Sequence, residues 1–85
     1  MYKMLLVFPN DGRKLRKLIL GLLKAKLATE IKRLNYVQSY RLVNANIEKK
    51  EEKLIFIQTE QKEKVLAFLQ KSFPEAHPLP FPFAF

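Results

Sequence analysis

Residues 36–59, YVQSYRLVNANIEKKEEKLIFIQT, contain two extended stretches joined by a short polar turn. Around the first stretch, apolar residues fall on even positions, which is the period of a β-strand with one buried face: Leu34, Tyr36, Tyr40 and Leu42. The second stretch begins at Ile47 and ends in LIFIQT, which is apolar on both faces. Asn44-Ala45-Asn46 lies between them, and Asn readily takes the left-handed conformation of a tight reversal. The segment therefore predicts a long β-hairpin.

The hairpin is flanked by patterns of two further strands and two helices. Tyr2–Phe8 is an apolar run typical of a central strand, and Asn10 or Asp11 can cap a helix over about residues 11–26. Apolar residues at helical spacing give that helix one core-facing stripe: Leu15, Leu18, Ile19 and Leu22. A second helix is predicted after Thr59 as its N-cap and before Pro74. Its apolar face is predicted to comprise Val65, Leu66, Phe68 and Leu69.

The last residues predict an edge strand, because large apolar side chains alternate with prolines: Leu79, Phe81, Phe83 and Phe85 against Pro80 and Pro82. The element order is thus strand, helix, strand, strand, helix, strand. It predicts a single α+β domain over residues 1–85 with a ferredoxin-like βαββαβ fold. Such a fold has an antiparallel four-stranded sheet, two helices on one face, and here a long hairpin between the second and third strands.

Two features of the hairpin predict an oligomer. Residues 47–59 would span about 40 Å when extended, whereas a compact domain of this length has a radius of gyration of only about 12 Å. Two helices cover one sheet face only, yet the central strands are apolar on both, and soluble monomers avoid large exposed apolar patches. We expect the subunit interface to involve Tyr36, Tyr40, Leu42, Ile47, Leu54 and Phe56.

The chain resembles the CutA family, the divalent-cation-tolerance proteins, as a divergent and C-terminally shorter member. Residues 51–59, EEKLIFIQT, fit the family segment EEVLLIIKT without a gap. Phe8-Pro9-Asn10 resembles the proline at the end of the family's first strand, and Lys26-Leu27-Ala28 resembles its RLAAC segment. Ser39 and Ile47 fit the ends of its S-x-Y-x-W-x-G-K-I turn, and Pro74 and Pro78 fit HPYxxP. The resemblance implies a homotrimer with extended intersubunit strands.

Several family signature positions differ in this sequence. The family's cysteine falls at Glu30, its aromatic pair before the turn at Arg41 and Val43, and its turn glycine at Ala45. The HPY histidine and tyrosine fall at Phe73 and Glu75. The resemblance therefore implies a non-enzymatic trimer with a divalent-cation tolerance role, in which any copper or zinc binding is weak.

Few residues suit catalysis or metal binding. The chain has no cysteine, one histidine and two glycines, which excludes thiolate chemistry and a glycine-rich phosphate loop. Ser39 and Ser72 have no identifiable base, so we expect no enzymatic activity. Glu75 and His77 can share a strand face and bind Cu²⁺ or Zn²⁺ weakly. The hairpin carboxylates Glu48, Glu51 and Glu52 are expected to pair with neighbouring lysines instead.

The charge distribution supports an alternative function. The net charge is +8, and residues 1–43 account for all of it, with ten Lys and Arg against two acids. Such asymmetry indicates either a solvated surface or a face for nucleic acid or another polyanion. The candidate residues on the first helix are Arg13, Arg16, Lys17 and Lys24, and Lys32 and Arg33 of the following strand can extend the patch. The first ten residues are too short an apolar run for a signal or a membrane span, so a cytoplasmic protein without a membrane partner is expected.

Overall fold

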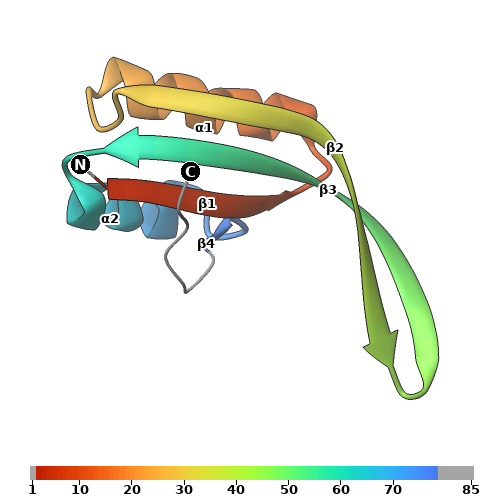
Figure 1. Ribbon diagram of the computed structural model, residues 1–85. Helices are drawn as coiled ribbons and strands as arrows, with labels where there is room; N and C mark the ends of the chain where they lie inside the picture. The colour runs from red at the N-terminus through yellow and green to blue at the C-terminus, as the bar shows by residue number, and fades with distance from the viewer. Residues whose placement is uncertain (1, 79–85) are drawn as a thin grey trace.

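The computed structural model describes residues 2–78 and has the ferredoxin-like architecture predicted from the sequence (Figure 1). Its elements follow the order strand, helix, strand, strand, helix, strand: β1 (Tyr2–Pro9), α1 (Gly12–Lys24), β2 (Glu30–Val43), β3 (Asn46–Thr59), α2 (Lys62–Ser72) and β4 (His77–Pro78). Across residues 2–78, neither helix is long and apolar enough to cross a membrane.

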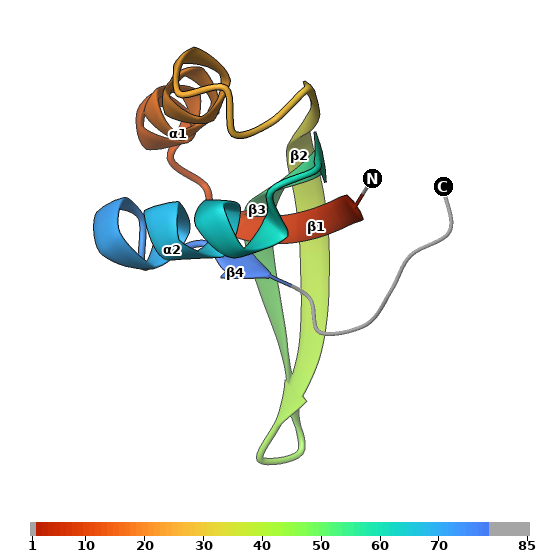
Figure 2. The same cartoon turned by 90° about the vertical axis from the view of Figure 1, so that its left-hand side faces the viewer.

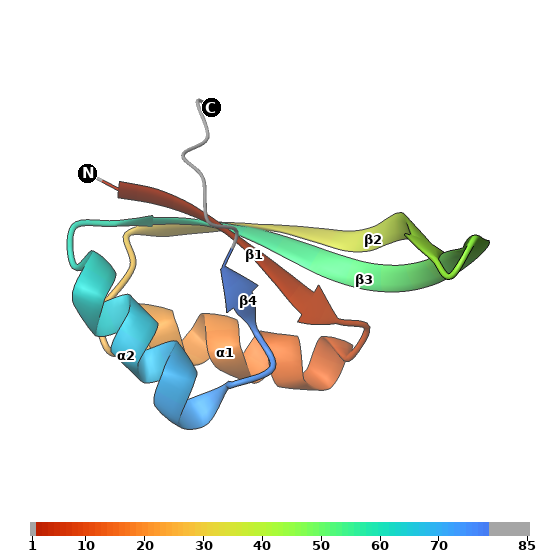
Figure 3. The same ribbon diagram turned by 90° about the horizontal axis from the view of Figure 1, so that it is seen from below.

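The four strands form one antiparallel sheet in the order β2-β3-β1-β4. Both helices lie on the same face of this sheet, as Figure 3 shows. The central position predicted for β1 is confirmed, because it pairs with β3 on one side and β4 on the other. Of the predicted edge strand, His77–Pro78 pairs with β1, and Leu79, Phe81, Phe83 and Phe85 lie outside the described residues.

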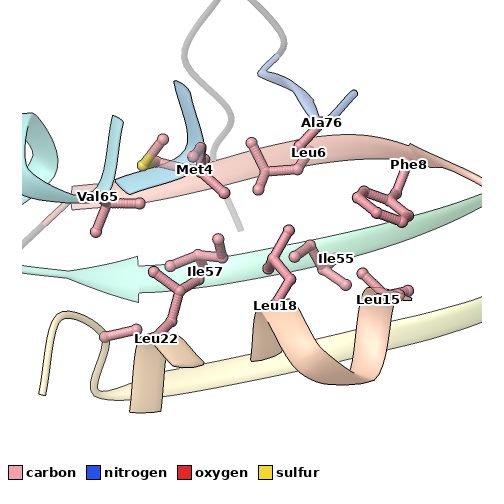
Figure 4. Packing of buried hydrophobic residues seen from close by; sticks show 12 residues of the cluster. Met4, Leu6, Phe8, Leu15, Leu18, Leu22, Ile55, Ile57, Val65 and Ala76 are labelled. Atoms are coloured by element: carbon pink, nitrogen blue, oxygen red, sulfur yellow. The ribbon is translucent and has the colours of Figure 1, made fainter. Parts of the chain in front are cut away.

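The core lies between the sheet and the helices (Figure 4). Alternate residues of the central strands point toward the helices, namely Met4, Leu6 and Phe8 from β1 with Ile55 and Ile57 from β3. They meet the predicted stripe of α1, in which Leu15, Leu18 and Leu22 are fully buried, and Val65 and Leu69 of α2. Gly21 lets the two helices approach closely, because a Cβ there would lie only 2.9 Å from Cζ of Phe68.

The ends of α1 are set by local hydrogen bonds. Asp11 is the N-cap, and its Oδ1 accepts from the backbone N–H of Lys14 at 3.1 Å. At the other end Lys26 has a left-handed backbone with φ of 57°. Its N–H donates to the carbonyl of Leu23, and the N–H of Leu27 donates to that of Leu22, which is the Schellman pattern of helix ends.

The N-cap predicted for α2 is wrong. Thr59 is the last residue of β3, and the N-cap is Gln61, two residues later. The Thr59 side chain is buried, and its hydroxyl donates to the carbonyl of Leu27 while it accepts from the backbone N–H of Gln61. Thr59 therefore fastens the strand end to the segment after α1, a use of threonine that the local sequence does not distinguish from capping.

The β2–β3 hairpin projects beyond the helices and the other strands (Figures 1 and 2). The molecule measures 43 × 28 × 21 Å, with a radius of gyration of 13.5 Å. The two strands are joined by the residues Asn44 and Ala45, which both have positive φ, 49° and 64°. The predicted reversal is confirmed in shorter form, because Asn46 already pairs with Val43 as part of β3. We call residues 36–52 the arm.

A β-bulge in β2 separates the arm from the rest of the sheet. Leu34 pairs with Leu54, but the next pair is Val37 with Glu52, so Asn35 and Tyr36 together stand opposite Lys53. The extra residue reverses the side-chain alternation of β2 relative to β3. The prediction that the even positions from Leu34 to Leu42 share one face is therefore wrong. Leu34 points to the sheet face away from the helices, and Tyr36, Tyr40 and Leu42 point to the opposite face.

Candidate functional site

One face of the arm carries four exposed apolar side chains, and we call it the apolar arm face. They are Tyr36, Tyr40, Leu42 and Ile47, with exposed fractions of 60%, 64%, 71% and 77%, and the register places Gln38, Lys49 and Glu51 among them. Leu42 and Ile47 stand directly opposite each other in the ladder. These four are among the six residues predicted for an interface, and the structure brings them together on one side of a projecting hairpin.

The two tyrosines of this face are held by a chain of side-chain hydrogen bonds. The Tyr36 hydroxyl donates to Oε1 of Glu51 at 3.0 Å and accepts from Nε2 of Gln38 at 2.8 Å. The Tyr40 hydroxyl donates to Oε1 of Gln38 at 3.0 Å. Their polar ends are thus tied to the arm, so the rings are held in place before any partner binds, which lowers the entropy cost of association.

The other face of the arm is mainly polar, with Val37 and Val43 at its two ends. Ser39 donates to Oε1 of Glu52 at 2.6 Å, and Glu52 also lies 3.9 Å from Nζ of Lys50. Arg41 and Glu48 face each other across the strands at 3.9 Å. The expected pairing of the hairpin carboxylates is confirmed for Glu52, whereas Glu48 pairs with arginine and Glu51 with a tyrosine. The arm is therefore amphipathic, with carboxylates that point to opposite faces.

The remaining two predicted interface residues lie elsewhere. Leu54 and Phe56 belong to the part of β3 inside the sheet, and both are half-buried. Their register partners Leu34 and Lys32 place them on the sheet face away from the helices. The bulge thus divides the predicted interface residues into two surfaces, the apolar arm face and this sheet face.

The residues proposed for metal binding lie at the start of β4. The Glu75 carboxylate forms an ion pair with Lys14 at 3.4 Å, and His77 is exposed and pairs in the ladder with Val7. Within residues 2–78 no group of three or more His, Asp or Glu side chains gathers as potential ligands. Metal binding by Glu75 and His77 stays a prediction, and two ligands would hold an ion only weakly.

The cationic residues predicted on the first helix are all exposed on α1: Arg13, Arg16, Lys17 and Lys24. Two further cations lie beside the first turn of this helix: Arg33, which the sequence already suggested together with Lys32 as an addition to this patch, and Lys53, which it did not. A Cβ on Gly12 would lie 3.2 Å from Nη2 of Arg33 and 3.6 Å from Cε of Lys53. The Nε of Arg33 is buried and has no hydrogen-bond partner in the part of the chain that the structure describes. No sequence signal brings Arg33 to Gly12, since the contact depends on how β2 passes α1.

The fold is that of the ferredoxin-like class with a β2–β3 hairpin extended beyond the sheet. No protein-family model matches the sequence, and no curated protein matches it significantly. Solved structures do match the fold. CutA1 from Pyrococcus horikoshii aligns with 100% of this chain and 85% of its own at 15% identity, with a TM-score of 0.77.

Two further solved structures agree with this match. The divalent cation tolerance protein of Thermus thermophilus covers 100% of this chain and 88% of its own at 16% identity, with a TM-score of 0.70. CutA of Synechococcus elongatus covers 94% and 76% at 21% identity, with a TM-score of 0.72. The chain therefore has the CutA fold, as the sequence resemblance implied.

Proposed function

We propose that this chain is a non-enzymatic, self-assembling CutA-like protein with a role in divalent-cation tolerance. The observation that carries the proposal is the apolar arm face, which projects from a fold shared with proteins described as divalent cation tolerance proteins. Four large apolar side chains on an exposed hairpin are unusual for a soluble monomer, and burial against another copy would remove them from water. We expect a homotrimer, as the resemblance to the CutA family implies.

The outer edge of the sheet supports the same proposal. Strand β2 runs over Glu30–Val43 and lies at one end of the strand order, so its outer backbone groups have no strand partner within residues 2–78. Long free edges tend to pair with other chains unless they are protected. A second copy that docks on the arm can pair with this edge while it covers Tyr36, Tyr40 and Leu42.

The cation role is proposed for Glu75 and His77 with Cu²⁺ or Zn²⁺. A histidine nitrogen and a carboxylate oxygen are donors that both ions accept. Because Glu75 is already paired with Lys14, a cation would have to compete with that ammonium group. We therefore expect weak binding that depends on both side chains.

Two measurements test the proposal separately. Light scattering on the full chain should give about three times the 10.0 kDa monomer mass at micromolar concentration, and a monomer would contradict assembly. Calorimetric titration with Cu²⁺ and with Zn²⁺ should give a signal that His77→Ala abolishes. Glu63→Gln, on the exposed side of α2, is the matched control and should titrate as the unchanged chain does. Equal titration by all three would contradict the metal site.

A further inference from the structure

We propose that α1 and the cations beside its first turn form a binding surface for the phosphodiester backbone of nucleic acid. We call this the basic surface, and it comprises Arg13, Arg16, Lys17 and Lys24 on α1 with Arg33 and Lys53 next to Gly12. The proposal is independent of assembly through the arm, because the arm contributes none of these six side chains.

No side chain of the basic surface forms an ion pair within residues 2–78. The ion pairs within residues 2–78 are Lys14–Glu75, Lys32–Glu30, Arg41–Glu48 and Lys50–Glu52, and none includes a basic-surface residue. The nearby carboxylate of Asp11 is used to cap α1. In the part of the chain that the structure describes, Nζ of Lys53 donates to the backbone carbonyl of Asn35 at 2.8 Å, and this acceptor is not a carboxylate. An external anion would therefore meet cations that have no competing carboxylate partner.

Arg33 is the residue that most clearly lacks an anion. It is half-buried, and its Nε is buried without a hydrogen-bond partner among the described residues. Its Nη2 lies against the first turn of α1, where the helix dipole adds positive potential. A guanidinium that is only partly hydrated and not paired gains more from an approaching phosphate than a fully solvated lysine does.

The arrangement favours nucleic acid over a membrane. Arg13, Lys17 and Lys24 follow one line along α1 that is about 16 Å long, and duplex DNA presents about ten charges over that distance. Insertion into a bilayer requires a continuous apolar helix face, but Leu15, Leu18 and Leu22 are buried in the core, which leaves Leu20 and Leu23, 39% and 40% exposed, as the accessible leucines of α1. The basic surface contains no aromatic residue for stacking on bases, so the binding should not depend on sequence.

Fluorescence anisotropy with a labelled DNA duplex of about 20 base pairs tests the proposal. If about four phosphates are neutralised, the logarithm of the binding constant should fall with that of the salt concentration with a slope of about −3.6. Raising the salt from about 50 mM to about 200 mM would then weaken binding roughly 150-fold. Arg13→Glu/Lys17→Glu should abolish measurable binding at the lower salt concentration.

The matched control is Lys64→Glu/Lys71→Glu, which changes the net charge equally on the exposed side of α2. It should retain most of the affinity and the same salt slope. Equal loss in both variants would show a general effect of net charge and would overturn the basic surface, as would absence of binding by the unchanged chain. Binding to phosphatidylserine vesicles without binding to DNA would overturn the proposal and identify an anionic membrane as the ligand of this surface. Leu42→Ser/Ile47→Ser should keep the DNA affinity per chain whether or not it assembles.

Discussion

Replacing Leu42 and Ile47 together with serine should dissociate the assembly, whereas replacing their neighbours Arg41 and Glu48 should not. The two pairs are adjacent rungs of the same ladder at the end of the arm, on opposite faces. Both pairs are exposed in the single chain, so neither change should unfold it. The comparison therefore asks which face of the arm carries the interface, with the position along the arm held constant.

The expected size of the effect follows from the exposed fractions. Full burial of a leucine or isoleucine side chain is worth about 1.5–3 kcal/mol. Leu42 and Ile47 are 71% and 77% exposed, so a partner can bury these fractions of their surface. Their loss should cost about 2–4 kcal/mol per arm, which is about 30-fold to 700-fold in each association constant. The exposed Arg41–Glu48 pair, 3.9 Å apart, should contribute less than about 1 kcal/mol.

Sedimentation equilibrium over a concentration series measures these constants, and circular dichroism confirms that each variant stays folded. The apolar variant should sediment as a 10.0 kDa chain where the unchanged protein and the Arg41→Ser/Glu48→Ser variant remain assembled. If the polar variant dissociates while the apolar one does not, the interface lies on the other face and the assignment is wrong. If neither variant dissociates, the apolar arm face is not the interface, and the sheet face of Leu54 and Phe56 is the remaining predicted surface.

Three further changes test the backbone and the core. Ala45→Gly should relieve a left-handed residue in the turn and increase hydrogen-exchange protection along the arm by about 0.5–1 kcal/mol, while Ala45→Val should decrease it. Lys26→Gly should raise the free energy of unfolding by a similar amount and the Tm by about 4 °C. Lys26→Ala keeps a non-glycine residue in the left-handed conformation and should leave both unchanged. Gly21→Ala should not raise the free energy of unfolding by the roughly 1 kcal/mol expected from helix propensity, because the new Cβ meets the Phe68 ring. In a Phe68→Leu background the same substitution should give that gain, and urea unfolding measures both.

Features that depend on neighbouring residues were predictable from the sequence. The cap at Asp11 and the reversal near Asn44 follow from side chains and backbone preferences within a few positions. The buried stripe of α1 follows from its spacing, and the apolar run of β1 correctly indicated a central strand. These local preferences also agree with the observed order of elements, which is why the fold could be assigned before the structure.

Features that depend on contacts across the chain were not predictable. Thr59 has the sequence context of a helix cap, and only the carbonyl of Leu27, 32 residues away, gives it a different role. Likewise Arg33 is one of many cations in the sequence, and its distinction is the buried, unpaired Nε beside Gly12. The candidate interface was predicted residue by residue, but its division into two surfaces required knowledge of the bulge.

The bulge reconciles two registers that the sequence demands in different parts of one hairpin. In the part of the hairpin that lies next to the helices, Leu34 stands opposite Leu54. If that register continued without a bulge, Arg41 would stand opposite Ile47 and Leu42 opposite Asn46. The two-residue turn instead requires Val43 to pair with Asn46, which shifts the distal register by one residue. In the shifted register Leu42 meets Ile47 as an apolar pair and Arg41 meets Glu48 as an oppositely charged pair, and each pair is more favourable than its unshifted alternative. The single extra residue at Asn35 and Tyr36 is therefore what makes the arm amphipathic, and an amphipathic arm is what gives a second copy an apolar face to bury.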